Sequence, residues 1–406
     1  MITTAKRILG EGFRAFFLGA AIWAVLSGVI WEVWLGGQAT GGAPDLPGLS
    51  MIPQHWHAHE MVFGYAAAAI GGFFLTAVAS GRGLVIGLLA ALWLAGRVVL
   101  WESALLPPVL VAVIDLSFLA VLAGRIGLQL TKRPKPQHAI FMVFLVTLTA
   151  GNLMVHLDWL GLWQGAASAG LRVGILALCG LIIILGGRLT PGFIRNAMNR
   201  AGRPPEALPP VTPRLDRAAI LSSIALPWSV LLPPLAPVVA LVLALVHGAR
   251  ISLWRPQWAL RDPLLWSLFA AQSLLVAGLF LWALAGWGIG DEVGALHVLA
   301  LGGIGGMTLA VMSRATLGHT GRAPIVPRGV AVGYGLMILS ALTRWLAADL
   351  LYRWYDPLVL IAGAAWIGAF VLFLVGMVPA LTGPRVARPA PSPPPPMPPH
   401  MKTSPS

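Results

Sequence analysis

Long runs of apolar residues, separated by short polar segments, occupy the chain up to about residue 380. A helix needs about 20 mostly apolar residues to cross the hydrocarbon core of a bilayer, and about twelve such runs are present. The pattern predicts an all-α, polytopic membrane protein with transmembrane helices at 15–36, 61–80, 84–100, 107–127, 138–157, 168–187, 218–232, 233–248, 264–287, 291–313, 329–350 and 356–378.

The charges between these runs predict the orientation of the spans. The odd-numbered loops carry acidic residues such as Glu102 and Asp158, and Arg353 is their only clear cation. The even-numbered loops and both termini carry the other basic residues, including six arginines from Arg188 to Arg217. Because cytoplasmic loops are enriched in Lys and Arg, we expect both termini to lie in the cytoplasm.

The seventh and eighth spans are the least regular part of the pattern. Their sequence, ILSSIALPWSVLLPPLAPVVALVLALV, is short for two crossings and contains Pro227, Pro233, Pro234 and Pro237. One kinked helix over 218–248 would invert every later span, whereas two short helices with a tight outer turn keep the charge alternation. We therefore expect two helices.

These boundaries divide the chain into two parts. Residues 1–380 are expected to form one transmembrane helical bundle. Residues 381–406 include the sequence RPAPSPPPPMPPH and are expected to form a Pro-rich, disordered cytoplasmic tail.

Composition agrees with the membrane prediction. The chain is 58% hydrophobic and 10% charged, whereas a soluble domain carries about 25% charged residues. The net charge of +13 reflects the basic cytoplasmic loops, so it indicates topology and not a nucleic-acid partner. The single cysteine, Cys179, excludes an intrachain disulfide, a thiolate-held iron–sulfur cluster and a CxxCH haem attachment.

Three histidines and a glutamate open the second span, in the sequence PQHWHAHEM at 53–61. Pro53 suits the first turn of a helix, so the span is expected to begin at the outer face. At about 100° per residue, His55 and His59 share one face and His57 points roughly the opposite way. This helix end is therefore predicted to present imidazoles in two directions.

Two further spans bring histidines to the same level of the membrane. His156 lies near the outer end of the fifth span, and His297 lies one turn into the tenth span from the outer side. A lone interfacial histidine is usually an anchor or a hydrogen-bond partner. Five at one depth favour a shared metal or haem site, because imidazole is a common ligand of copper, zinc and haem iron. The candidate ligands are His55, His57, His59, His156 and His297.

Arg97, Arg172 and Arg344 lie at the outer ends of the third, sixth and eleventh spans. Ionisable groups within a membrane usually face a partner or a water-filled cavity. These arginines are therefore candidates to bind haem propionates or another anion, although each one alone also fits snorkelling to the interface.

Other polar and sulfur-containing side chains lie near the outer histidines. Glu60 and Asp115 are candidates to carry protons or to neutralise the arginines, and Asn152 lies one turn before His156, where it can orient that ring. Met307 is a candidate soft ligand for copper, although methionine is also common core filler.

Two glycine-containing segments support more modest interpretations. In GGIGGM at 302–307, Gly302 and Gly306 have the spacing of closely packed membrane helices, and no strand precedes them as a phosphate loop would require. The sequence RATLGHTGR at 314–322 lies in a predicted cytoplasmic loop. Its Arg314, His319 and Arg322 are candidates to bind an anion, and a helix-ending turn is the alternative.

Four stretches together resemble the NnrS family: GFRAFFL (12–18), WHAHEMVFGY (56–65), GGRLTPGFIRNA (186–197) and HVLALGGIGGMTLAVMSRATLGHTGR (297–322). The resemblance covers nearly the whole membrane portion. It implies a multi-pass bacterial inner-membrane protein associated with haem, copper and the response to nitric oxide. The characteristic positions that match are His57, His59, Glu60, Asn152, His156, His297, Met307, Arg314, His319 and Arg322.

The leading hypothesis is therefore a haem- and copper-containing protein that binds nitric oxide and contributes to resistance to nitrosative stress. His57 and His59 would serve two different centres, and His156 and His297 would complete them. Turnover of nitric oxide would also require protons and a source of electrons, and the sequence indicates no electron donor. The alternative is a membrane transporter for a metal, a tetrapyrrole or a small anion.

Overall fold

The computed structural model describes residues 2–42, 44–77, 83–132 and 136–387. In these residues every regular element is a helix. The helices are α1 (Ile2–Ile8), α2 (Gly12–Ala39), α3 (Pro53–His59), η1 (Glu60–Ala66), α4 (Ala67–Ala77), α5 (Leu84–Trp101), η2 (Ser103–Leu105), α6 (Pro108–Lys132), α7 (Pro136–Trp159), α8 (Ala166–Arg200), η3 (Pro205–Ala207), α9 (Pro213–Ser229), α10 (Ala236–Ser252), α11 (Pro256–Ala259), α12 (Pro263–Gly286), α13 (Glu292–His297), η4 (Val298–Gly305), α14 (Gly306–His319), α15 (Arg328–Asp349), η5 (Tyr352–Trp354) and α16 (Tyr355–Thr382).

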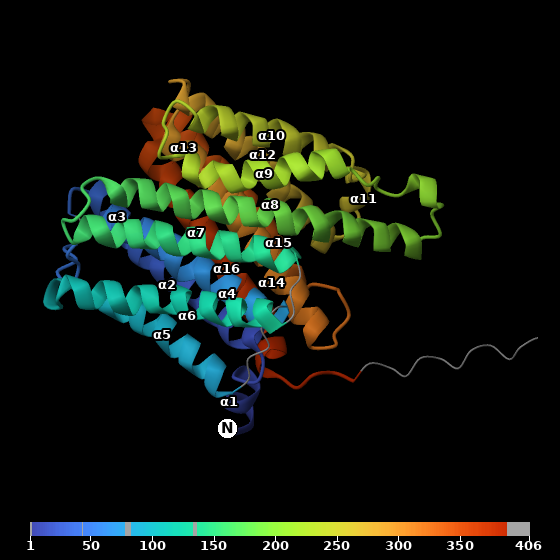
Figure 1. The fold of residues 1–406 in the computed structure, drawn as a ribbon, viewed down its shortest axis with the longest axis horizontal. Helices are drawn as coiled ribbons and strands as arrows, with labels where there is room; N and C mark the ends of the chain where they lie inside the picture. The colour runs from blue at the N-terminus through green and yellow to red at the C-terminus, as the bar shows by residue number, and fades with distance from the viewer. Residues whose placement is uncertain (1, 43, 78–82, 133–135, 388–406) are drawn as a thin grey trace, which may run out of the picture.

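The predicted all-α, polytopic membrane fold is confirmed. Within the described residues, ten helices or continuous runs of helix are long and apolar enough to cross a membrane. They lie roughly side by side in one bundle (Figure 1). The Pro-rich tail from residue 388 onward lies outside the described residues.

Segment 218–248 forms two helices, as the charge pattern predicted. α9 and α10 contain 17 residues each and pack against each other, as their adjacent ribbons show (Figure 1). Pro227 lies near the end of α9. Pro237 lies in the first turn of α10, where the missing N–H has no helical partner to lose. Within the described residues, ten of the twelve predicted spans are therefore helices long and apolar enough to cross a membrane; α10 is a shorter apolar helix, and α9 does not reach either class.

Helix α8 is longer than the sequence pattern predicted. The sixth span was expected to end at residue 187, before the arginine-rich loop, but α8 continues through Pro191 to Arg200. Hydropathy marks where a helix leaves the apolar core and not where its backbone hydrogen bonds end. The chain turns only at Gly202, which adopts a φ of +67° that favours glycine.

The two helices that carry the candidate histidines share an unusual backbone feature. After His59 the helix changes to a π-helix, η1, and after His297 it changes to a second π-helix, η4. Such wider turns are rare and are frequent at functional sites. Both segments lie where the helices pass through the bundle, and η4 packs against α8, α12 and α15.

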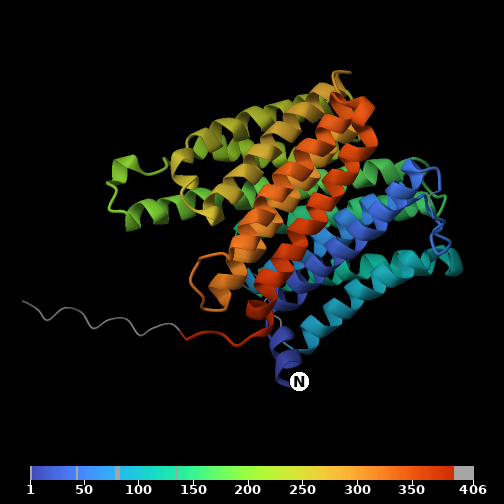
Figure 2. The same ribbon diagram turned by 180° about the vertical axis from the view of Figure 1, so that it is seen from behind.

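Both described chain ends lie at the same end of the bundle, as the two opposite views show (Figures 1 and 2). Arg14, in the first turn of α2, donates hydrogen bonds to the carbonyl oxygens of Leu381 at 2.7 Å and Gly383 at 2.9 Å. The guanidinium group therefore satisfies free carbonyls at the C-terminus of α16. This end is the one that the charge distribution predicts to be cytoplasmic, and the histidine-rich α3 begins at the other end (Figure 1).

Candidate functional site

The five candidate histidines divide into two neighbouring sites. His59 and His156 belong to a fully buried polar cluster, whereas His55, His57 and His297 line a large cavity. His55 and His59 were predicted to share one face of the helix, but they contribute to different sites. Gln54, Ala58 and Met61 form the stripe that faces the cavity, and His55 and His57 flank this stripe on either side.

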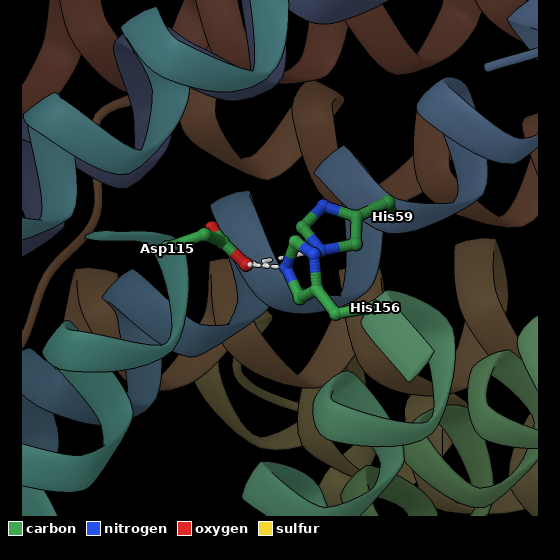
Figure 3. A group of neighbouring side chains, drawn as sticks. All are labelled: His59, Asp115 and His156. Atoms are coloured by element: carbon green, nitrogen blue, oxygen red, sulfur yellow. Dashed lines mark hydrogen bonds and ion pairs between the residues drawn. The ribbon is translucent and has the colours of Figure 1, made fainter. Parts of the chain in front are cut away.

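The buried cluster centres on Asp115 of α6. His59 Nε2 lies 3.2 Å from Asp115 Oδ2, and His156 Nε2 lies 2.9 Å from the same oxygen. Asn152, which was predicted to orient His156, instead contacts His59 Nε2 through its Oδ1 at 2.8 Å and donates from Nδ2 to Asp115 Oδ2 at 2.8 Å. The two imidazoles thus approach one carboxylate oxygen from different helices (Figure 3).

Arg97 joins this cluster to Glu60. Its Nη1 donates to both Glu60 oxygens, at 2.9 and 2.8 Å, and its Nη2 is hydrogen-bonded to Asp115 Oδ1. Trp23 Nε1 also donates to Glu60 Oε2 at 2.6 Å. All of Arg97, Glu60 and Asp115 are at most 3% exposed, so both Nη groups of Arg97 are committed to buried carboxylates, while its Nε has no hydrogen-bond partner among the described residues.

Gly64 in η1 makes room for the ion pair between Arg97 and Glu60. A Cβ atom at this position would lie 2.6 Å from Arg97 Nη1 and 2.6 Å from Glu60 Oε2. The motif HEMVFG therefore supplies a histidine, a carboxylate and the space for its partner within six residues.

The charges of the cluster leave room for a cation. Two carboxylates, Glu60 and Asp115, face one guanidinium group, Arg97, so with neutral imidazoles the cluster carries one excess negative charge, which a bound cation or a proton on His59 would balance. A buried charge needs a compensating partner. The ligand atoms of His59, Asp115 and His156 all lie within 4.8 Å of one another, and two imidazoles with one carboxylate form a donor set suited to a divalent transition metal.

The large cavity has a volume of about 440 Å³ and lies between α2, α3, α8, α13, α15 and α16. This is within the range of cofactor and ligand pockets. Its walls are mainly apolar and aromatic, with Trp31, Tyr65, Tyr355 and Trp366 among them. The polar groups that reach it are His55, His57, His297, Glu32, Arg172 and Arg344, with Gln54 and Ser168.

Two of these histidines have a ring nitrogen available for a metal. The His297 Nδ1–H donates to the carbonyl oxygen of Val293 at 2.7 Å, so in the neutral ring Nε2 carries the lone pair. The ring of His57 stacks on Trp31, with centroids 4.2 Å apart. Its buried Nδ1 has no hydrogen-bond partner among the described residues. Each ring is therefore held in one orientation by contacts that leave one of its nitrogens available to a metal.

The two arginines of the cavity differ in what they bind. Arg172 forms a bidentate ion pair with Glu292, with distances of 2.6 Å from Nε and 2.8 Å from Nη2. Arg344 is only 7% exposed, and its Nη1 has no hydrogen-bond partner within the described part of the chain. Arg344 is therefore the cavity arginine that is available to an anionic group of a ligand.

The remaining candidates lie elsewhere in the bundle. Met307 lines a separate small cavity and does not line the histidine cavity. Arg314 lies over the ring of Phe193, with its Cζ 3.5 Å from the centroid. His319 packs on Phe13, and Arg322 approaches the carbonyl oxygen of Pro384 at 3.5 Å. These three side chains contact α8, α2 and the segment that follows α16, respectively.

The glycine pattern at 302–307 serves helix packing, as predicted. A Cβ atom at Gly302 would lie 2.7 Å from Leu274 of α12, and one at Gly306 would lie 3.3 Å from Ala271. Both glycines therefore allow the helix that carries His297 to approach α12 closely.

Two carboxylates have a larger part in these sites than the sequence pattern predicted. Asp115 was considered for proton transfer but not as a metal ligand, and Glu32, which lines the histidine cavity, was not considered. The signal for both is the same: each is the only acidic residue within its predicted span, and isolated charges in a membrane are rare without a function.

A comparison with known protein families gives one match, to the family described as NnrS protein, over residues 7–385. No curated protein and no solved structure matches the chain. The family match extends from before α2 to beyond α16 and includes both histidine sites. The chain therefore belongs to the NnrS family.

Proposed function

We propose that this protein is a haem- and copper-containing protein of the bacterial inner membrane that binds nitric oxide and contributes to resistance to nitrosative stress. The observation that carries the proposal is the pairing of two sites within one bundle. His57, His297 and Arg344, whose Nη1 has no hydrogen-bond partner among the described residues, line one cavity, and His59, Asp115 and His156 converge in a buried cluster beside it.

The cavity residues suit a haem. His57 and His297 each offer a ring nitrogen that is not committed to another group, and imidazole is the usual axial ligand of haem iron. Arg344 offers donors for a propionate, while the aromatic walls suit a flat apolar macrocycle. A bound haem supplies an iron at which nitric oxide can coordinate. His57 and His297 would hold it, Arg344 would bind its anionic edge, and the apolar walls would exclude water.

The buried cluster suits a second metal. His59 and His156 supply two nitrogens and Asp115 supplies an oxygen, and we propose copper as the ion. Asn152 and Arg97 hold Asp115 in place by hydrogen bonds, which is the role of residues that support metal ligands. The cation would balance the excess negative charge that Glu60 and Asp115 leave beside Arg97.

The test is the cofactor content of purified single variants. His57→Ala and His297→Ala should lose haem, and His59→Ala and His156→Ala should lose copper, because each change removes a ligand from only one site. His319→Ala is the matched control, since His319 packs on Phe13 and belongs to neither site, and this variant should retain both cofactors. Full retention of haem and copper in all four ligand variants would overturn the proposal.

A further inference from the structure

A second, smaller cavity lies inside the bundle. It has a volume of about 60 Å³, and we call it the apolar chamber. Thr308 is the only polar side chain among its lining residues, and the Thr308 hydroxyl is already hydrogen-bonded to Tyr65 and to the carbonyl oxygens of Ile304 at 2.8 Å and Gly305 at 3.0 Å. A buried water needs two to four polar partners, so the chamber does not suit water.

The chamber lies about one helical turn from the histidine cavity on three different helices. Four residues advance a helix by about 6 Å. In each case a residue that lines the cavity is followed four positions later by one that lines the chamber, as Tyr65 and Ala69, Leu178 and Ile182, and Ile304 and Thr308 show. The hydrogen bond between Tyr65 and Thr308 lies at the boundary between the two spaces.

The other side of the chamber faces the surface of the bundle. Its lining residues Ile70, Phe73 and Val311 are partly exposed and belong to helices apolar enough to cross a membrane. In a membrane these side chains therefore contact lipid. The chamber lies between the lipid phase and the histidine cavity.

We propose that the apolar chamber binds one small, uncharged gas molecule that enters from the lipid phase. A volume of about 60 Å³ exceeds the roughly 10–15 Å³ that a cavity needs to hold one water molecule, so the chamber has room for a small molecule. The identity of the gas as nitric oxide rests on the proposed function, whereas the existence of the site does not.

Xenon is the probe for the site, because it is apolar and binds dry cavities of this kind. The protein in lipid nanodiscs is titrated with xenon, and binding is followed by ¹²⁹Xe NMR. Val311→Phe fills the chamber from one wall, and Ala69→Leu fills it from another. Val375→Phe is the matched control, since Val375 is 72% exposed on α16 and lines neither space.

We expect saturable xenon binding in the natural protein and in Val375→Phe, and its loss in Val311→Phe and Ala69→Leu. Absence of saturable binding in the natural protein would overturn the inference, as would equal binding in all four proteins. Binding that appears in detergent and is abolished in nanodiscs would also overturn it, because a lipid chain would then occupy the chamber.

A second measurement distinguishes this inference from the proposed function. If haem is present, nitric oxide should associate with it at least about threefold more slowly in Val311→Phe than in Val375→Phe, because access is narrowed. Xenon binding by a protein that contains no haem would overturn the proposed function and leave the gas site standing. A protein that contains haem but does not bind xenon would overturn the gas site and leave the proposed function standing.

Discussion

The hydroxyl groups of Tyr65 and Thr308 are hydrogen-bonded to each other, and this contact links the two helices that carry the histidine sites. Tyr65 lies in η1, which follows His59, and Thr308 lies just after η4, which follows His297. Trp366 and Phe370 of α16 pack edge-on against the ring of Tyr65. A single side chain thus connects both π-helical segments with the last helix of the bundle.

Replacing Tyr65 by Phe should therefore lower the free energy of unfolding by about 1 kcal/mol, the usual contribution of one buried hydrogen bond. The ring remains held by Trp366 and Phe370, so haem and copper should be retained. Thermal unfolding in detergent measures the change. Tyr352→Phe is the control, because Tyr352 is 65% exposed. Equal melting temperatures for the two variants would show that the bond contributes nothing.

Replacing Arg97 by Met should be much more damaging. It leaves Glu60 and Asp115 buried without their common cation, and unpairing a buried charge costs about 3–5 kcal/mol. We expect a large fall in the yield of folded protein and in its melting temperature. Arg353→Met, at an exposed arginine, is the control for loss of charge alone. A melting temperature for Arg97→Met equal to that of the control would contradict the buried network.

A substitution at Gly64 tests the same network by steric crowding and not by removal of a charge. Gly64→Ala places a Cβ atom against Arg97 and Glu60, and overpacking of a tight site costs about 1–3 kcal/mol. Gly36→Ala is the matched control, because nothing lies within 4 Å of a Cβ atom at Gly36 of α2. Chemical or thermal unfolding should show destabilisation for Gly64→Ala only. Similar stability of both variants would mean that η1 can shift to accept the methyl group.

Arg344 should matter for haem binding more than Arg172. Arg344→Met removes a buried guanidinium group with an unpartnered nitrogen, and a hydrogen bond to a charged group contributes about 1.5–3 kcal/mol. That loss corresponds to haem binding weakened by about tenfold or more. Arg172→Met should have the smaller effect, because Arg172 is already bound to Glu292. Titration of haem into the apo forms measures both, and the reverse order would assign the propionate to Arg172.

The fold followed from the sequence because apolar length and the sign of loop charges report directly on membrane crossings. This is why even the Pro-broken segment 218–248 was correctly divided into α9 and α10. The extension of α8 to Arg200 was missed, since hydropathy does not report where a helix ends outside the apolar core.

The residues of the sites were found more easily than their partners. The histidines stand out because imidazoles are unusual in apolar spans, but their division into two sites depends on which face of α3 meets α8 and which meets α7. Asn152 contacts His59, although it was expected to orient His156. Glu60 and Asp115 were expected to neutralise the arginines, and both pair with Arg97, but the sequence did not indicate which arginine they would meet. Such pairings depend on helix rotation and on the π-helices η1 and η4, and a regular 3.6-residue period does not predict either.

The absorption spectrum of the purified protein, recorded before and after addition of nitric oxide, is the decisive measurement for the proposed function. We expect a Soret band that shifts when nitric oxide binds, together with copper in metal analysis. The proposed function would be contradicted by a fully folded protein that is colourless and free of copper. If that protein carried a metal, a tetrapyrrole or an anion across a membrane, it would be a transporter instead.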